Sequence, residues 1–150
     1  MTSSFKRVTT KQLGELLIER KIITAEQLQK ALEYQRVNGG LVGEILVQLG
    51  FSREEDIAQV LTAQYGFPYL PLANYDIDAE VARIIPEQVA RQYCLIPIDK
   101  IANNLTVAMS NPLNTQAIED VETITQCVVQ AFVSTATDIK KAIERSYVKK

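Results

Sequence analysis

The sequence predicts an α+β protein in which two tandem αα-hairpins form an N-terminal helical subdomain and a small α+β subdomain with a short sheet follows. Apolar residues recur at helical spacing as far as Gly66. Segments 12–35 and 41–64 repeat one another. After Pro68, runs of β-branched residues alternate with short helical patterns, which is typical of an α+β unit. We therefore divide the chain into a flexible arm over 1–9, the duplicated hairpins over 10–66 and the α+β subdomain over 67–150.

The first hairpin is predicted from two adjacent helical patterns. The pattern that begins at Thr10 leads to the next helix, where Thr24 and Gln27 have the spacing of a capping box, each side chain meeting the other residue's backbone N–H. The second helix ends in the sequence Val-Asn-Gly-Gly, which tolerates positive φ. Its apolar face carries Leu28, Ala31, Leu32 and Gln35.

The second hairpin follows the same plan. The helix that begins near Val42 stops at Gly50, and we expect Ser52 to cap the next helix. That helix ends before Gly66 and Pro68. Equivalent positions of the two hairpins are 29 residues apart, as in Gly14 with Gly43. Such self-similarity indicates a duplicated unit whose two copies bury their apolar faces against each other.

The second half is predicted as short helices and three strands. Helical patterns cover 78–85, 86–93, 111–125 and 134–148, with a turn at the start of 111–125. Aliphatic and β-branched runs at 94–101, 104–110 and 127–133 indicate strands. The Ala-Asn-Asn sequence between the first two runs is typical of a hairpin turn.

Composition excludes several classes of function. The 150 residues are 47% hydrophobic, carry a net charge of −2 and include no histidine, so the commonest general base and metal ligand is missing. No phosphate-binding glycine loop is present. Cys94 and Cys127 lie in apolar runs without metal-type spacing. No apolar stretch approaches the roughly 20 residues of a membrane span, and residues 1–10 lack a signal-peptide core. We predict a non-enzymatic cytoplasmic protein without catalytic residues, metal or cofactor.

Two features of the repeat remain open. A glycine in the first turn of each hairpin, Gly14 and Gly43, is unfavourable for a helix and indicates a close approach to the backbone. The approaching group is either the partner hairpin or a flat ligand. Gln35 and Gln64 lie on the apolar side of their helices, so each amide either caps a helix end or bonds to a ligand edge.

The repeated segments, with residues 85–98, 105–125 and 133–147, resemble the N-terminal domain of type II secretion and type IV pilus assembly ATPases. The resemblance runs from about Thr10 to Tyr147. In full-length members the ATPase core follows this domain. We expect the chain to be either an excised domain, which would work with an ATPase core, or a standalone homologue.

One branch of that family implies binding of cyclic di-GMP through a motif written twice, R-L-G-x-x-L-x-x-x-G-x-L-x-x-x-x-L-x-x-x-L-x-x-Q. In this chain Gln12 and Leu41 replace its two arginines, Lys21 replaces a glycine and Ser52 replaces an apolar residue. A guanidinium can bond to a guanine edge through two parallel hydrogen bonds, so the replacements weaken this hypothesis. The candidate ligand seat comprises Gln12, Leu13, Gly14, Leu17, Leu28, Leu32, Gln35, Val42, Gly43, Leu46, Gly50, Ile57, Leu61 and Gln64.

The other branch implies docking to an inner-membrane platform protein, which would bring the domain to the membrane periphery without insertion. Docking does not need the motif arginines. The arm and first helix mix Phe5, Lys6, Arg7, Lys11 and Arg20 with apolar residues, so they form either a docking surface or an ordinary solvated face. A near-neutral charge argues against binding a nucleic-acid polymer.

Overall fold

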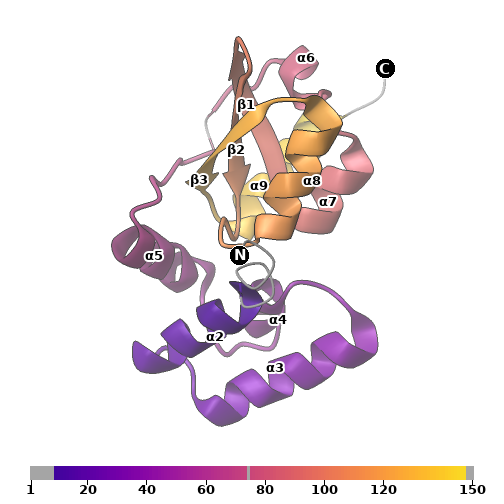
Figure 1. Ribbon diagram of the computed structural model, residues 1–150. Coiled ribbons are helices and arrows are strands. Elements are labelled where there is room, and N and C mark those ends of the chain that lie inside the picture. Colours follow the sequence, from indigo (N-terminus) through magenta and orange to yellow (C-terminus); the bar gives the residue numbers. More distant parts are fainter. Residues whose placement is uncertain (1–8, 74, 148–150) are drawn as a thin grey trace.

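A computed structural model describes residues 9–73 and 75–147. Most of the expected arm, residues 1–9, lies outside the described residues. Four helices form the first half: α2 (Thr9–Glu19), α3 (Ala25–Asn38), α4 (Val42–Gln48) and α5 (Glu54–Tyr65). Figure 1 shows them as one group below the second half, with α5 next to β3.

The helical half is held together by one apolar core. Its fully buried side chains include Leu13, Leu17, Leu46 and Leu61, which come from α2, α4 and α5. α3 packs on α4, and α2 packs on both α4 and α5. The two predicted hairpins therefore share their apolar faces, and the predicted helical subdomain is confirmed.

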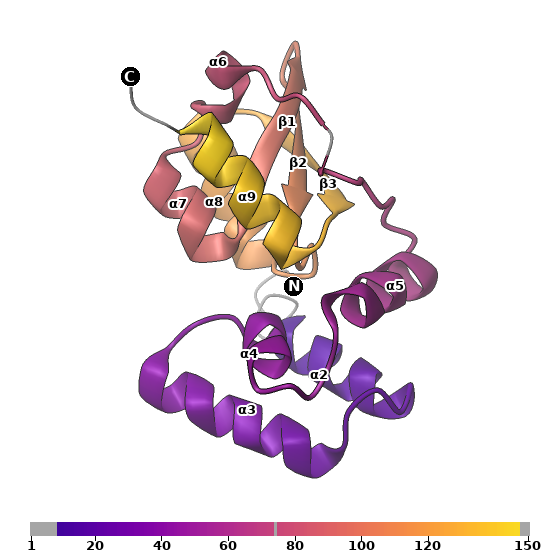
Figure 2. The same ribbon diagram turned by 180° about the vertical axis from the view of Figure 1, so that it is seen from behind.

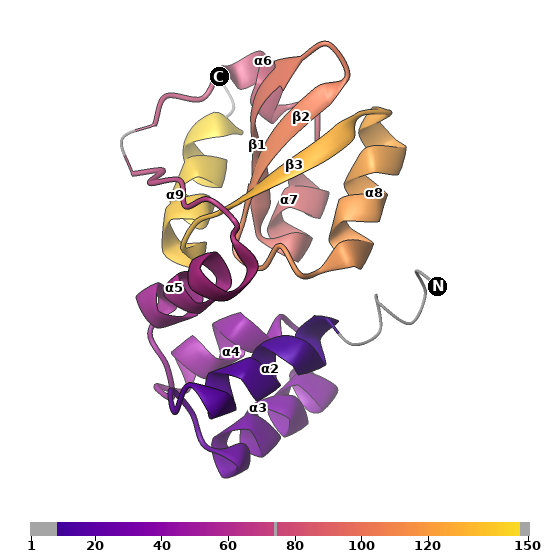
Figure 3. The same cartoon turned by 60° about the vertical axis from the view of Figure 1, so that its left-hand side comes forward.

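The second half contains a sheet of three strands with helices packed on it. Its elements are α6 (Ala79–Ala82), α7 (Glu87–Tyr93), β1 (Leu95–Ile101), β2 (Asn104–Met109), α8 (Thr115–Thr125), β3 (Val128–Val133) and α9 (Ala136–Ser146). In the view of Figure 3 the strands lie in front of α7 and α8. The α+β fold class predicted from the sequence is confirmed.

The sheet has mixed topology in the order β1-β2-β3. β1 and β2 form the predicted antiparallel hairpin, and its turn places Ala102 at φ 54°. β2 and β3 are parallel, so α8 serves as the crossover connection that parallel strands require. The loops that follow β2 and β3 consequently meet at one end of the sheet, the end that faces the helical half (Figure 2).

The connection between the halves covers part of the outer edge of β3. The Val133 N–H donates to the Pro68 carbonyl over 2.8 Å, and the Leu70 N–H donates to the Val133 carbonyl over 2.8 Å. Further along the strand, the Val129 N–H donates to the Glu122 carboxylate over 3.0 Å. Val133 is also buried in the core of the helical half, so β3 contributes to both halves.

Candidate functional site

The two repeat glycines face matching residues, but at different distances. A Cβ atom added to Gly14 would lie 2.8 Å from Leu28 Cδ1, and one added to Gly43 would lie 3.9 Å from Ile57 Cδ1. Leu28 and Ile57 are themselves 29 residues apart. Each glycine thus faces the matching apolar residue on the second helix of its own hairpin. The approach is close at Gly14, whereas at Gly43 the distance is that of an ordinary van der Waals contact and the nearest atom is Leu13 Cδ2 of the first hairpin, at 3.8 Å.

The ends of the first helices also match in the two hairpins. Lys21 and Gly50 both have positive φ, at 63° and 80°. The residue after each of them donates its N–H to the carbonyl five positions earlier. Ile22 donates to the Leu17 carbonyl and Phe51 to the Leu46 carbonyl, both over 2.9 Å. Lys21 therefore takes the backbone conformation that the motif assigns to glycine, which shows that this position serves the helix end.

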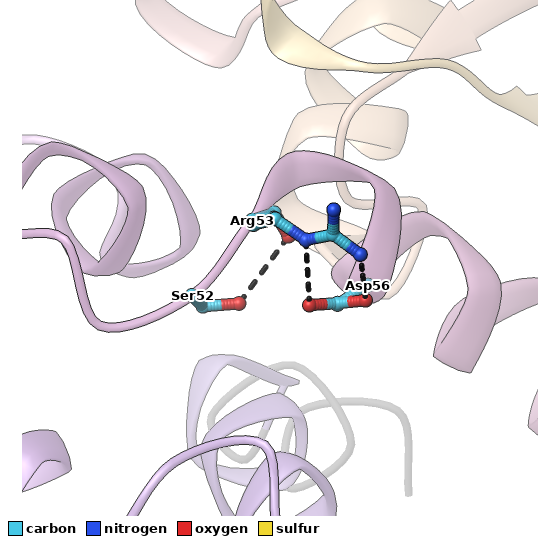
Figure 4. Close-up of polar contacts among 3 residues, drawn as sticks. All are labelled: Ser52, Arg53 and Asp56. Atoms are coloured by element: carbon cyan, nitrogen blue, oxygen red, sulfur yellow. Dashed lines mark hydrogen bonds and ion pairs between the residues drawn. The ribbon is translucent and has the colours of Figure 1, made fainter.

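The start of α5 corrects one prediction. Ser52 does not cap the helix; Arg53 holds the N-cap position without a side-chain cap. Ser52 Oγ donates to the Arg53 carbonyl oxygen over 3.3 Å, and the Arg53 guanidinium donates to the Asp56 carboxylate over 3.4 Å (Figure 4). The first hairpin has its capping box as predicted, with Thr24 accepting from the Gln27 N–H over 3.1 Å. Thr24 and Arg53 are 29 residues apart, so the repeat itself indicated the correct cap.

Most candidate seat residues point into the helical core. Leu28 and Leu32 are partly buried against that core, and the fully or nearly fully buried members are Leu13, Leu17, Val42, Leu46, Ile57 and Leu61. The amide of Gln35 donates to the Gly40 carbonyl over 2.9 Å and so holds the turn after α3. Gln12 and Gln64 lie in α2 and α5, but their side chains are outside the described part of the chain.

A cleft of about 320 Å³ lies between the halves and contains part of the candidate seat. Leu13, Val42, Gly43 and Ile57 line it from the helices, beside Leu41, which replaces the second motif arginine. The opposite wall was not predicted from the sequence. It consists of Tyr93, Ser110, Asn111, Asn114 and residues 134–137 and 140.

Two carboxylates of the second hairpin cross the cleft to α9. Glu44 Oε1 lies 2.9 Å from Lys140 Nζ, with a quarter of the Glu44 side chain exposed. The Glu54 carboxylate accepts the Thr137 N–H over 2.8 Å and also contacts the Thr137 hydroxyl. A carboxylate in the first turn of α9 is favoured by the helix dipole. Glu44, the glutamate of the second copy of the repeat, therefore has a structural partner, Lys140.

The cleft carries no evident catalytic group. Burial, with a smaller contribution from Glu44, raises the pKa of the neighbouring Cys94 thiol to about 12, so a reactive thiolate does not form near neutral pH. The hydrogen bond to Asp120 raises the pKa of Tyr93 to about 12, and burial adds to the rise. Within residues 9–73 and 75–147, no group of three acidic or cysteine side chains is placed to hold a metal ion.

Comparison with known proteins identifies the relationship. Residues 65–150 match the family model of the MshEN domain. The chain belongs to the MshEN domain family. That match covers the end of α5 and the α+β half. The type IV pilus assembly ATPase PilB of Myxococcus xanthus (strain DK1622) extends the likeness to the hairpins, with 34% identity over 93% of this chain.

Solved structures related to the MshEN domain agree with this assignment. The structure of MshE with cdg matches 90% of this chain and 98% of its own, with a TM-score of 0.66 and 27% identity. The N-terminal domain of XpsE matches 93% of this chain and 96% of its own, with a TM-score of 0.77 and 22% identity, which establishes the shared fold. The resemblance to N-terminal domains of secretion and pilus ATPases is confirmed.

The chain spans about a quarter of the length of the Myxococcus PilB that it matches. Its MshEN fold thus corresponds to one part of a longer relative. None of the helices in the described ranges is long and apolar enough to cross a bilayer.

Proposed function

We propose that this MshEN domain is a non-enzymatic regulatory and docking domain of a type II secretion or type IV pilus assembly ATPase. It binds an inner-membrane platform protein and couples that protein to the motor. The observation that supports docking over nucleotide binding is the position of Leu41. Leu41 lines the cleft where the motif has an arginine, and its side chain packs against the core of the α+β half.

The exposed surface of the hairpins supplies the apolar contacts that docking needs. Val37, at the end of α3, is 66% exposed, and Leu49, just after α4, is 36% exposed. Large apolar side chains on a surface contribute to protein interfaces when they cluster with others. The sequence also offers the basic arm and first helix as a docking surface, but residues 1–8 lie outside the described part of the chain.

Docking is tested by pull-down with the cytoplasmic part of an inner-membrane platform protein from the same machine. We expect the unaltered chain to retain that fragment. Val37→Glu combined with Leu49→Glu should weaken retention about tenfold, because two apolar contacts become charged. Ile101→Glu, on the β1–β2 hairpin and 69% exposed, is the matched control and should not change it. Failure of the unaltered chain to retain the fragment would contradict docking.

A second candidate function is a cyclic di-GMP sensor that uses degenerate motifs. It is supported by the similarity to the structure of MshE with cdg, which we take to be cyclic di-GMP, over 90% of this chain. Against it, neither motif arginine is present. A folded chain that gives no heat with high-micromolar cyclic di-GMP in calorimetric titration would leave docking alone.

Restoring the arginines separates the two functions. Gln12→Arg with Leu41→Arg should create or strengthen cyclic di-GMP binding about 5- to 150-fold per residue, because each bidentate contact to guanine contributes roughly 1–3 kcal/mol. Gln12→Lys with Leu41→Lys is the matched control, since an ammonium has the charge without the planar fork. If the arginine variant folds and still gives no heat, the glycines and leucines of the motif serve packing and the sensor hypothesis is wrong.

A further inference from the structure

The two contacts across the cleft converge on the first turns of one helix, α9. Thr137 lies in the first turn of α9 and Lys140 in the next. Their partners, Glu54 and Glu44, come from the start of α5 and the first turn of α4. Both contacts therefore attach the second hairpin to the end of α9 that faces the helical half.

The duplication shows that these carboxylates are not needed for hairpin packing. In the first copy, Glu44 is matched by Glu15, which is exposed on α2, and Glu54 is matched by Ala25. The first hairpin folds with the matching glycine contact and the same helix end without those contacts to α9. The second copy thus has carboxylates with a role in joining the halves.

Packing between the halves is incomplete beside these contacts. The cleft of about 320 Å³ separates α4 and α5 from the start of α9, whereas elsewhere Val133 is buried in the helical core and Leu41 packs against the α+β core. The Lys140 side chain is 56% exposed, and ion pairs of that exposure are weak and easily exchanged. These two polar contacts are therefore suited to opening and re-forming while the apolar contacts of Val133 and Leu41 keep the halves joined.

The far end of α9 is held firmly in the α+β half. Tyr147 Oη lies 2.6 Å from the carbonyl oxygens of both Ala82 and Ile85. α9 carries the buried residues Ile139, Ala142 and Ile143 between the two ends. The helix thus runs from the cleft to the opposite end of the molecule, as Figure 2 shows.

We propose that the Glu44–Lys140 and Glu54–Thr137 contacts form a releasable latch that sets the orientation of the hairpins on α9. Opening the latch lets the hairpins reorient relative to α9, which stays fixed in the α+β half. The partner that opens the latch is inferred from the proposed function: a platform protein docked on the hairpins would compete with these contacts. The latch itself is a property of this chain and needs no partner to be observed.

The test measures the distance between the two halves with paired spin labels at Glu33→Cys on α3 and Glu144→Cys on α9. The native thiols are buried and leave the introduced cysteines as the accessible ones. We expect one narrow distance distribution in the labelled parent and a broad one after Glu44→Gln with Glu54→Ala. The control pair, Glu15→Gln with Glu55→Ala, removes two exposed carboxylates from the same hairpins and should keep the distribution narrow.

Two further measurements guard against a folding defect. Glu54→Ala should accelerate hydrogen exchange of the Thr137 amide about tenfold, the expected loss for a hydrogen bond to a charged acceptor. In a chain that carries Glu54→Ala, Glu44→Lys with Lys140→Glu should give a narrower distribution than Glu44→Gln does, since the ion pair is re-formed in reverse. A folded latch variant with a narrow distribution and an unchanged Thr137 amide would overturn the latch.

The outcomes separate the latch from the proposed function. If the latch variant has a broadened distribution but the unaltered chain retains no platform fragment, the latch is supported and docking is contradicted. If the distribution is unchanged but the unaltered chain retains the fragment, docking is supported and the latch is contradicted.

Discussion

At the scale of single residues, the equivalent positions of Lys21 and Gly50 show how backbone conformation determines the motif's preference for glycine. Both have left-handed backbone geometry, which costs a lysine roughly 1–2 kcal/mol and a glycine almost nothing. A Cβ atom at Gly50 would meet nothing within 4 Å, so only the backbone decides the preference there.

We therefore expect Lys21→Gly to raise the free energy of unfolding by about 0.5–1 kcal/mol, after the entropy of the added glycine is subtracted. Gly50→Ala should lower it by about 1 kcal/mol for the converse reason. Urea denaturation followed by circular dichroism measures both. Equal and small effects at the two sites would contradict a shared role at the helix ends.

Residue-level prediction succeeded where the interaction is local. The capping box of Thr24 and Gln27 needs only two side chains three positions apart, and it forms as expected. The cap of α5 was misplaced by one residue because serine has the higher intrinsic preference for that position. Three acidic residues in the first turn of α5 favour its positive end, so the helix forms without a side-chain cap.

At the scale of elements, the junction of α9 with α6 depends on one phenol. Burial raises the pKa of Tyr147 to about 12, with a smaller contribution from Glu87. The folded form holds its proton above the pH at which the unfolded chain loses it. This contribution to stability is therefore complete below about pH 10 and is lost as the pH rises toward 12.

We expect the free energy of unfolding to fall between pH 10 and 12, and to fall less steeply in Tyr147→Phe. Part of the slope should remain in that variant, because Tyr93 has a similarly raised pKa. Near neutral pH the substitution should cost about 1 kcal/mol through its lost hydrogen bond. Urea denaturation across this pH range measures both effects, with exposed Tyr75→Phe as the control. An identical slope in Tyr147→Phe and the parent would count against this assignment.

Elements were predicted well where periodicity is strong, and so was the β1–β2 hairpin, whereas the pairing of β3 was not predicted. Helical spacing located α2 to α5, and β-branched runs located all three strands among the described residues. The parallel pairing of β2 with β3 depends on how α8 packs, which no local pattern contains. The same is true of the proline-broken segment after Gly66, whose sequence is typical of extended chain but gives no sign that it lies along β3.

At the scale of the whole molecule, the change of texture near Gly66–Pro71 correctly indicates two kinds of structure. Only one wall of the cleft between them is predictable. Its helical wall follows from the repeat, whereas Tyr93, Asn111 and Lys140 are brought together by three separate elements. Glu44 occupies a repeat position, but its ion pair with Lys140 spans nearly 100 residues and has no signature in either segment.

The short pairing of Pro68–Leu70 with β3 has a consequence for self-association of this protein. An uncovered strand edge invites another chain to lengthen the sheet, which leads to aggregation. Here the connecting segment takes the Val133 amide and Glu122 takes that of Val129. The β3 edge is therefore covered in part by a piece of chain that composition alone would class as a linker. A fragment that begins at Leu72 would lose that shield, whereas one that begins at Tyr65, where the family match starts, would retain it.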